Sequence, residues 1–219
     1  MAASILNNVS ALQATRQLGI TANGMKQTIE RLTTGKRINH ASDDATGLAQ
    51  ANSLSADSRI ASENRKLANN TYYAAAADDG YLDEATNLVL RAVELAAGGN
   101  DSSSEFSSVI GLATAAAAKA TGVTVSLGAI SDATSAKNAL SSIATGRGTV
   151  ASTMAKAQSN ANLYGIESEN KTAQMSNIMD ADIGAEVVNL TKWQILGQAG
   201  TSALSNANQS SQTVLGLLR

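Results

Sequence analysis

The sequence contains no cysteine and no proline among its 219 residues. Without cysteine, the chain cannot form a disulfide framework, a thiolate nucleophile or a cysteine-based zinc site. Proline makes up about 5% of ordinary proteins and is the strongest helix breaker, so its absence permits continuous helices over the whole length. Both absences also suit passage through a narrow channel in the unfolded state, because neither crosslinks nor slow prolyl isomers can form.

Aromatic residues are also scarce, at 3%, although the hydrophobic fraction of 43% is ordinary. Much of the hydrophobic content is alanine, and such small side chains favour thin helices lying close together over a globule with a deep pocket. The net charge of -2 argues against nucleic acid as a partner. Since the sequence has no basic amphipathic face and no run of about eighteen apolar residues, we expect no membrane partner. The N-terminus lacks a basic start and an apolar core, so we expect no cleaved signal peptide.

The sequence offers no candidate catalytic set. Its one histidine, His40, stands near Asp43 and Asp44, and we interpret these residues as a loop and a helix cap, not as a metal or acid–base site. Asp78–Asp79 and the Asp180 and Asp182 pair are interpreted as solvated faces or caps. No serine–histidine–aspartate set, phosphate loop or HExxH zinc motif occurs. We therefore expect no enzyme activity, no cofactor and no metal.

Helical periodicity covers most of the chain. A weak apolar stripe predicts a helix at residues 4–34, and after a polar loop Ser42 or Asp43 is the expected N-cap of a long helix at 44–97. Two glycines then end that helix, and residues 101–105 offer a cap for a short helix to about Ala120. Residues 123–127 alternate like a strand, and we expect an extended turn or one arm of a small hairpin there.

The clearest heptad pattern lies in the second half of the long helix. A matching seam begins near Ala136 and supplies its partner, in which Gly146 and Gly148 are expected to loosen one turn. The pattern predicts an all-α fold, an elongated antiparallel helical hairpin or bundle with coiled-coil-like seams and at most a small β element near 122–130. The two seams consist of Leu82, Ala85, Val89, Ala92 and Ala96, and of Leu140, Ile143, Arg147, Val150, Met154, Ala157, Ala161 and Tyr164.

A thinner stripe follows the last forty residues, where half of the apolar positions are alanine and the opposite face is Asn, Gln and Ser. A helix like this is marginal alone, so we expect it to become ordered only against other helices, including those of other copies of the chain. The contrast with the stronger middle predicts two domains. Residues 1–41 with 180–219 form paired terminal helices, and residues 42–179 form the long antiparallel helices.

Two stretches at opposite ends of the chain resemble bacterial flagellins. The likeness covers roughly residues 1–97 and 136–219, and two independent signatures in the right order make a chance similarity improbable. The N-terminal signature is Glu30–Asn39, Ala41, Asp43–Ala45 and Gly47–Ala49, and the C-terminal one is Gln194–Leu196, Gln198–Leu204, Ala207–Gln209 and Val214–Arg219.

The resemblance implies a non-enzymatic subunit that is exported unfolded and polymerises outside the cell into the flagellar filament. It also implies that the terminal helices form an inner tube and the long helices an outer layer, while the short link in the middle predicts a bare core without large outer domains. The implied partners are other copies of the chain, the flagellar export apparatus, a secretion chaperone, and hook-associated and cap proteins. The expected polymerisation residues are Ile5, Val9, Leu12, Ile183, Val187, Leu190, Leu196, Ala199, Ala203, Leu217 and Leu218.

One segment around Arg91 and Leu95 resembles the part of flagellin that Toll-like receptors recognise, which implies these two residues as receptor contacts. The alternative is an ordinary helix, since Leu90 and Val93 stand where relatives commonly carry polar or basic residues. Arg91 lies roughly 200° around the helix from the seam residue Val89, so we expect it to be exposed, whereas Leu95 borders the seam. Two other functions stay open, namely a hook-filament junction protein and, from another class, a secreted enzyme on a helical scaffold.

Overall fold

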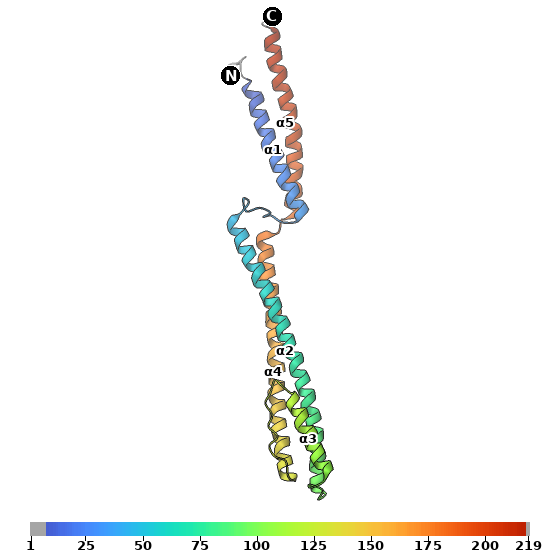
Figure 1. The fold of residues 1–219 in the computed structure, drawn as a ribbon. Helices are drawn as coiled ribbons and strands as arrows, with labels where there is room; N and C mark the ends of the chain where they lie inside the picture. The colour runs from blue at the N-terminus through green and yellow to red at the C-terminus, as the bar shows by residue number, and fades with distance from the viewer. Residues whose placement is uncertain (1–7, 218–219) are drawn as a thin grey trace. The chain divides into compact units, whose positions relative to one another are not determined.

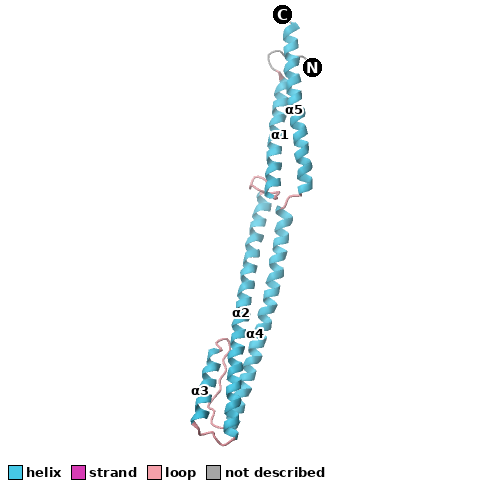
Figure 2. Cartoon of the chain, turned by 90° about the vertical axis from the view of Figure 1, so that its right-hand side faces the viewer, coloured by secondary structure: helices cyan, strands magenta, loops and turns pink. Residues whose placement is uncertain are grey.

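A computed structural model of the chain describes residues 8–217, most of which lie in five helices. No strand occurs in this described part, where an isolated antiparallel bridge joins Lys36 and Asp180. The predicted all-α class is therefore confirmed, and residues 120–132 are extended chain, not a hairpin arm (Figure 2). The helices are α1 (Val9–Thr34), α2 (Ala45–Ala97), α3 (Ser104–Lys119), α4 (Ala133–Met179) and α5 (Ile183–Leu217) (Figure 1).

The chain divides into two compact units. One combines residues up to Ser55 with those from Thr172 onward, and the other consists of residues 56–171. The terminal unit contains α1 and α5, and the central unit contains α3 and the facing portions of α2 and α4. The domain boundaries at 41/42 and 179/180 concern layers of an assembled filament, and they stay a prediction.

The core of the central unit is built from the two predicted heptad seams. Leu82 and Val89 of α2 and Ile143 of α4 are fully buried, and α3 packs against them through Ala113 and Ala117. The first seam is thereby confirmed, because helices with apolar residues at alternating steps of three and four bury them against a partner. The second seam is confirmed at Ile143, Val150, Ala157 and Ala161 but was wrong at Arg147, which pairs with Asp79 and Asp83 while the neighbouring Gly146 is buried. Farther along the same two helices, small side chains replace the large aliphatic ones between α2 and α4. The buried residues there are Ala61, Ala68, Ala157 and Ala161. The hydroxyl oxygens of Ser58 and Ser168 lie 3.1 Å apart.

A buried carboxylate anchors the extended segment that follows α3. Asp78 is only 6% exposed, and its two oxygens accept hydrogen bonds from the backbone N–H groups of Thr121 at 3.1 Å and Gly122 at 2.9 Å. Its neighbour Asp79 pairs with Arg147 at 3.0 Å. The interpretation of Asp78–Asp79 as a solvated face or cap was therefore wrong for Asp78, which accepts from backbone donors where the chain leaves α3.

Gly146 has a packing role that the sequence analysis missed. Helix α4 continues through Gly146 and Gly148 without interruption, so the expected loosening of a turn was wrong. Gly146 is buried, and a Cβ there would collide with the side chain of Val125. The glycine thus lets the extended segment lie directly on α4.

In the terminal unit, α1 and α5 lie side by side and antiparallel (Figures 1 and 2). Near one end of the pair, the amide of Asn8 donates to the carbonyl of Ala207 at 3.0 Å, and near the other end Arg31 and Glu186 form an ion pair at 3.2 Å. Asn8 also caps α1 by accepting from the backbone N–H of Ala11.

The connections at the base of this pair are tied together by backbone hydrogen bonds. The N–H of Arg37 donates to the carbonyl of Met179 at 2.6 Å, and the N–H of Ala181 donates to the carbonyl of Gly35 at 2.9 Å. Gly35 ends α1 in the left-handed region, with φ of +68°. In the loop from α1 to α2, the side chain of Ile38 is buried, at 1% exposure, and holds the loop in place.

The cap of α2 differs from the expected one. Asp44 accepts a hydrogen bond from the backbone N–H of Gly47 at 2.8 Å, so Asp44, and not Ser42 or Asp43, caps the N-terminus of α2. The carboxylate of Asp43 instead accepts from the backbone N–H groups of Asn39 and His40, at 3.1 and 3.0 Å. These bonds hold the pKa of Asp43 below its ordinary value, with the His40 N–H as the main cause.

Candidate assembly surface

The packing between α1 and α5 relies on glycines. A Cβ at Gly24 would lie 2.7 Å from ring carbon Cε2 of Trp193, and one at Gly200 would lie 2.7 Å from Cδ2 of Leu18. Each glycine therefore receives a large side chain from the opposite helix. Gly24 costs roughly 1 kcal/mol relative to Ala in a helix, and its packing role explains its position. This cost did not identify the contact from sequence, because Gly19 carries the same cost and has nothing within 4 Å of its Cβ position.

Polar side chains occupy the buried positions of this helix pair. Thr21 and Thr28 of α1 and Glu186 of α5 are buried, and the Thr21 hydroxyl donates to the carbonyl of Gln17 at 2.9 Å. Within the described side chains of α1 and α5, no aliphatic residue is buried. The pair thus lacks an aliphatic core of its own, in contrast to the central unit.

Many of the large aliphatic side chains of α1 and α5 instead face solvent. Leu12 is 72% exposed, Val9 56%, and Ile183 and Val187 47% each. We call the exposed aliphatic residues of the two helices the assembly surface. It consists of Val9, Leu12, Ile20, Ile29, Ile183, Val187, Val188 and Ile195.

The expected polymerisation residues fall into three groups. Val9, Leu12, Ile183, Val187, Ala199 and Ala203 are exposed, whereas Leu190 and Leu196 are half-buried. Ile5, Leu218 and the side chain of Leu217 lie outside the described part of the chain. Ile20, Ile29, Val188 and Ile195 were not predicted as contacts, although each is a large aliphatic residue on a helix rich in polar ones.

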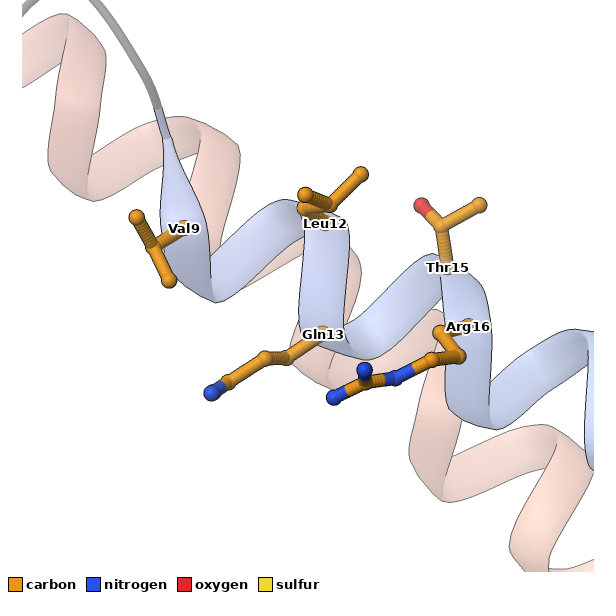
Figure 3. A pocket seen from close by; sticks show the side chains of 5 residues that line it. All are labelled: Val9, Leu12, Gln13, Thr15 and Arg16. Carbon is orange, nitrogen blue, oxygen red and sulfur yellow. The ribbon is translucent and has the colours of Figure 1, made fainter.

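A hollow of about 580 Å³ lies beside α1 near its N-terminal end. The described residues that line it all belong to α1, and Figure 3 shows their side chains projecting from that helix. Two of them, Val9 and Leu12, belong to the assembly surface, and Arg16 adds a positive charge to the lining. The full lining is Val9, Leu12, Gln13, Thr15 and Arg16.

The predicted receptor contacts differ in accessibility. Arg91 is exposed, as expected, and its guanidinium pairs with Glu94 at 3.2 Å and Glu105 at 2.9 Å. The hydrogen bond to Glu105 is the main cause that raises the pKa of Arg91 above its ordinary value. Leu95 is only 8% exposed and packs in a small cluster with Ala92 and Phe106.

The remaining polar candidates lie in the connecting loops. The Nδ1 atom of His40 lies 3.4 Å from a carboxylate oxygen of Glu30, while Asp182 caps α5 by accepting from the N–H of Ala185. Among the described residues, no three or more His, Cys, Asp or Glu side chains converge on a possible metal position. Over the same residues, none of the helices is both long enough and apolar enough to cross a membrane.

Two family descriptions match almost the whole sequence. The bacterial flagellin N-terminal helical region matches residues 5–109, and the bacterial flagellin C-terminal helical region matches residues 113–218. These matches extend the resemblance beyond residues 1–97 and 136–219, into the part that forms α3 and the extended segment.

Individual relatives match over different lengths. Flagellin B of Vibrio cholerae is 41% identical and polar flagellin A of Vibrio parahaemolyticus 39% identical, each over 108 residues, or 48% of this chain. These alignments cover 29% of each Vibrio relative, so the chain spans well under two thirds of their length. The flagellar filament 30.7 kDa core protein of Treponema maltophilum is 28% identical over 98% of this chain and 99% of that relative.

Proposed function

Because the chain belongs to the bacterial flagellin family, we propose that it is a structural subunit that polymerises with copies of itself into a helical flagellar filament. Flagellins are structural proteins that form the filament outside the cell, and they are not enzymes. Within this family, no feature of the chain favours a junction protein or a secreted enzyme over a filament subunit.

The observation that carries the proposal is the distribution of polar and apolar residues on α1 and α5. Polar side chains are buried between the two helices, and large apolar side chains are exposed. Thr21, Thr28 and Glu186 are buried, while Leu12 and Val9 are 72% and 56% exposed. Apolar patches that remain exposed on a soluble protein are typical of interaction sites. The assembly surface provides apolar area that other copies of the same helix pair would cover, and each Å² removed from water contributes roughly 25 cal/mol.

Further partners follow from the same family. We propose that the chain passes through the flagellar export apparatus with the help of a secretion chaperone and adds to the filament between hook-associated and cap proteins. The weak terminal pair supports unfolded export, because helices without an aliphatic core unfold at low cost. A Toll-like receptor contact at Arg91 stays a prediction. Leu95 is buried, so it would stabilise the helix that presents Arg91 and would not touch the receptor itself.

Electron microscopy of purified protein after addition of filament seeds tests the proposal. We expect long uniform filaments from the unmodified chain and none from Leu12→Asp, which places a carboxylate on the assembly surface. Gln17→Asp is the matched control, since Gln17 is exposed on α1 but does not belong to that surface. Soluble monomers from the unmodified chain under every seeding condition would overturn the proposal.

Deletion of residues 1–30 tests the proposed two-layer organisation. We expect the shortened chain to lose assembly but to keep cooperative unfolding, because both buried hydrophobic clusters lie within residues 56–171. Circular dichroism during a thermal ramp measures this. Loss of cooperative unfolding itself would contradict the proposed division.

A further inference from the structure

Asn23 and Gly24 form the only Asn–Gly pair in the sequence, and they lie in the interior of α1. Asn23 is exposed, and Gly24 is half-buried beneath the ring of Trp193. We propose that Asn23 is a site of spontaneous deamidation that is protected only while α1 is paired with α5. This protection comes from the contacts of the helix pair and does not require that the chain polymerises.

The chemistry requires no reagent other than water. In a flexible chain the backbone nitrogen of Gly24 loses its proton and attacks the side-chain amide carbon of Asn23. The new N–C bond closes a succinimide ring, and the side-chain nitrogen leaves as ammonia with the proton. Water then opens the ring at either carbonyl and gives aspartate or isoaspartate. Glycine favours the first step, because it has no side chain to hinder the attacking nitrogen.

A folded α1 blocks the first step. In an α-helix the N–H of Gly24 donates to the carbonyl of Ile20, four residues earlier, so the nitrogen is occupied. Helical backbone angles also fix the peptide plane, which prevents the nitrogen from turning towards the Asn23 amide. Ring closure therefore has to wait for a local opening of the helix.

The opening of α1 depends on its contact with α5. Alone, α1 is a marginal helix, since it buries no aliphatic side chain and contains Gly19 and Gly24. Trp193 packs so closely on Gly24 that a Cβ would lie 2.7 Å from the ring, so the pairing requires glycine at this position. The same glycine that admits Trp193 makes Asn23 reactive whenever the two helices separate.

Deamidation would make the separation permanent. Isoaspartate carries an extra carbon in the main chain, which shifts the hydrogen bonds of a helix and displaces Gly24 from the Trp193 ring. Molecules that stay unpaired would therefore lose the ability to pair. If the chain assembles as proposed above, aged and unassembled copies would be excluded from the polymer.

The test uses the full-length protein incubated at mildly alkaline pH, in buffer and across a urea series. Peptide mass spectrometry measures deamidation at Asn23, and methyl transfer by protein isoaspartyl methyltransferase measures isoaspartate. Asn100, in the exposed turn after α2, serves as an internal reference because it belongs to the central unit and not to the unit that contains α1 and α5. Trp193 is the only tryptophan in the sequence, so its fluorescence reports the helix pairing.

We expect Asn23 to deamidate at least about tenfold more slowly in buffer than in urea, because reaction is limited to the opened fraction. The rate at Asn23 should rise at the urea concentration where the Trp193 emission changes, and Trp193→Ala should raise it in buffer while Asn100 stays constant. Asn23→Gln should keep the native emission and form no isoaspartate at position 23. An Asn23 rate in buffer equal to the rate in urea, or one that is independent of the Trp193 emission, would overturn the inference.

Discussion

Trp193 of α5 packs on Gly24 of α1 so closely that a Cβ at position 24 would lie 2.7 Å from the indole ring. Gly200 of α5 receives Leu18 of α1 in the same way, again at 2.7 Å. The two terminal helices therefore pair by inserting one large side chain from each helix opposite a glycine of the other. This mode of pairing needs little apolar burial and leaves most aliphatic side chains of both helices exposed.

Replacing Gly24 by alanine should weaken this pairing. The new Cβ would force the Trp193 ring to move, and overpacking of this kind costs about 1–3 kcal/mol. We expect a red-shifted Trp193 emission and a lower midpoint in urea. Gly19→Ala is the control, since nothing lies within 4 Å of its Cβ position, and it should stabilise α1 by about 0.5–1 kcal/mol. Equal effects of both changes would contradict the packing role of Gly24.

Strong periodicity allowed the long helices to be predicted, while close contacts escaped prediction. The seam residues Leu82 and Val89 have large side chains at heptad spacing, so they identify their own partner face. Gly24, Gly146 and Asp78 act through atoms that come from distant parts of the chain, namely Trp193, Val125 and the backbone at 121–122. Sequence spacing carries no information on such contacts. For this reason the glycines within helices were expected only to weaken those helices and not to make contacts.

Gly146 should be the more sensitive glycine of α4. Alanine at 146 would collide with Val125 and lift the extended segment, at a cost of about 1–3 kcal/mol. Alanine at Gly148, which has nothing within 4 Å, should stabilise the helix by about 0.5–1 kcal/mol. Thermal unfolding of both variants measures this. Val125→Ala should partly rescue Gly146→Ala, and a purely additive double variant would show that these two residues do not meet.

Asp78→Ala should destabilise the central unit through its backbone partners. The change removes the charged acceptor of the Thr121 and Gly122 N–H groups, and hydrogen bonds to a charged group contribute about 1.5–3 kcal/mol. Asp83→Ala is the control, because Asp83 is exposed and pairs with Arg147 on the surface, where ion pairs contribute less than about 1 kcal/mol. Urea unfolding followed by circular dichroism compares the two. A larger loss for Asp83→Ala would refute the anchoring role.

Asp43 should make the loop between α1 and α2 sensitive to acid. Its pKa is held below the ordinary value of 3.8 by the N–H groups of His40 and Asn39, so the folded state binds the proton less readily than the unfolded state. The stabilisation is therefore present above pH 3.8 and is lost as the pH falls through the lowered pKa. Unfolding of the unmodified chain and of Asp43→Asn should differ at neutral pH and converge in acid. A constant difference down to the most acidic pH would contradict this assignment.

Leu95 and Arg91 lie one turn apart on α2, yet their substitutions should differ sharply. Leu95 is 8% exposed and packs with Ala92 and Phe106, so Leu95→Asp would bury an unpaired carboxylate. A loss of more than about 3 kcal/mol is expected from such a change, together with reduced filament yield.

Arg91→Ala removes only ion pairs whose members are all more than half exposed, with Arg91 at 52%, Glu94 at 68% and Glu105 at 57%. Pairs of this kind contribute less than about 1 kcal/mol, so its unfolding temperature and filament yield should stay near those of the unmodified chain. Thermal unfolding and sedimentation of seeded filaments compare the two variants. Because Leu95 joins α2 to α3, its effect should already be seen in the monomer. Equal filament yields from stable monomers would mean that Leu95 does not hold these helices together.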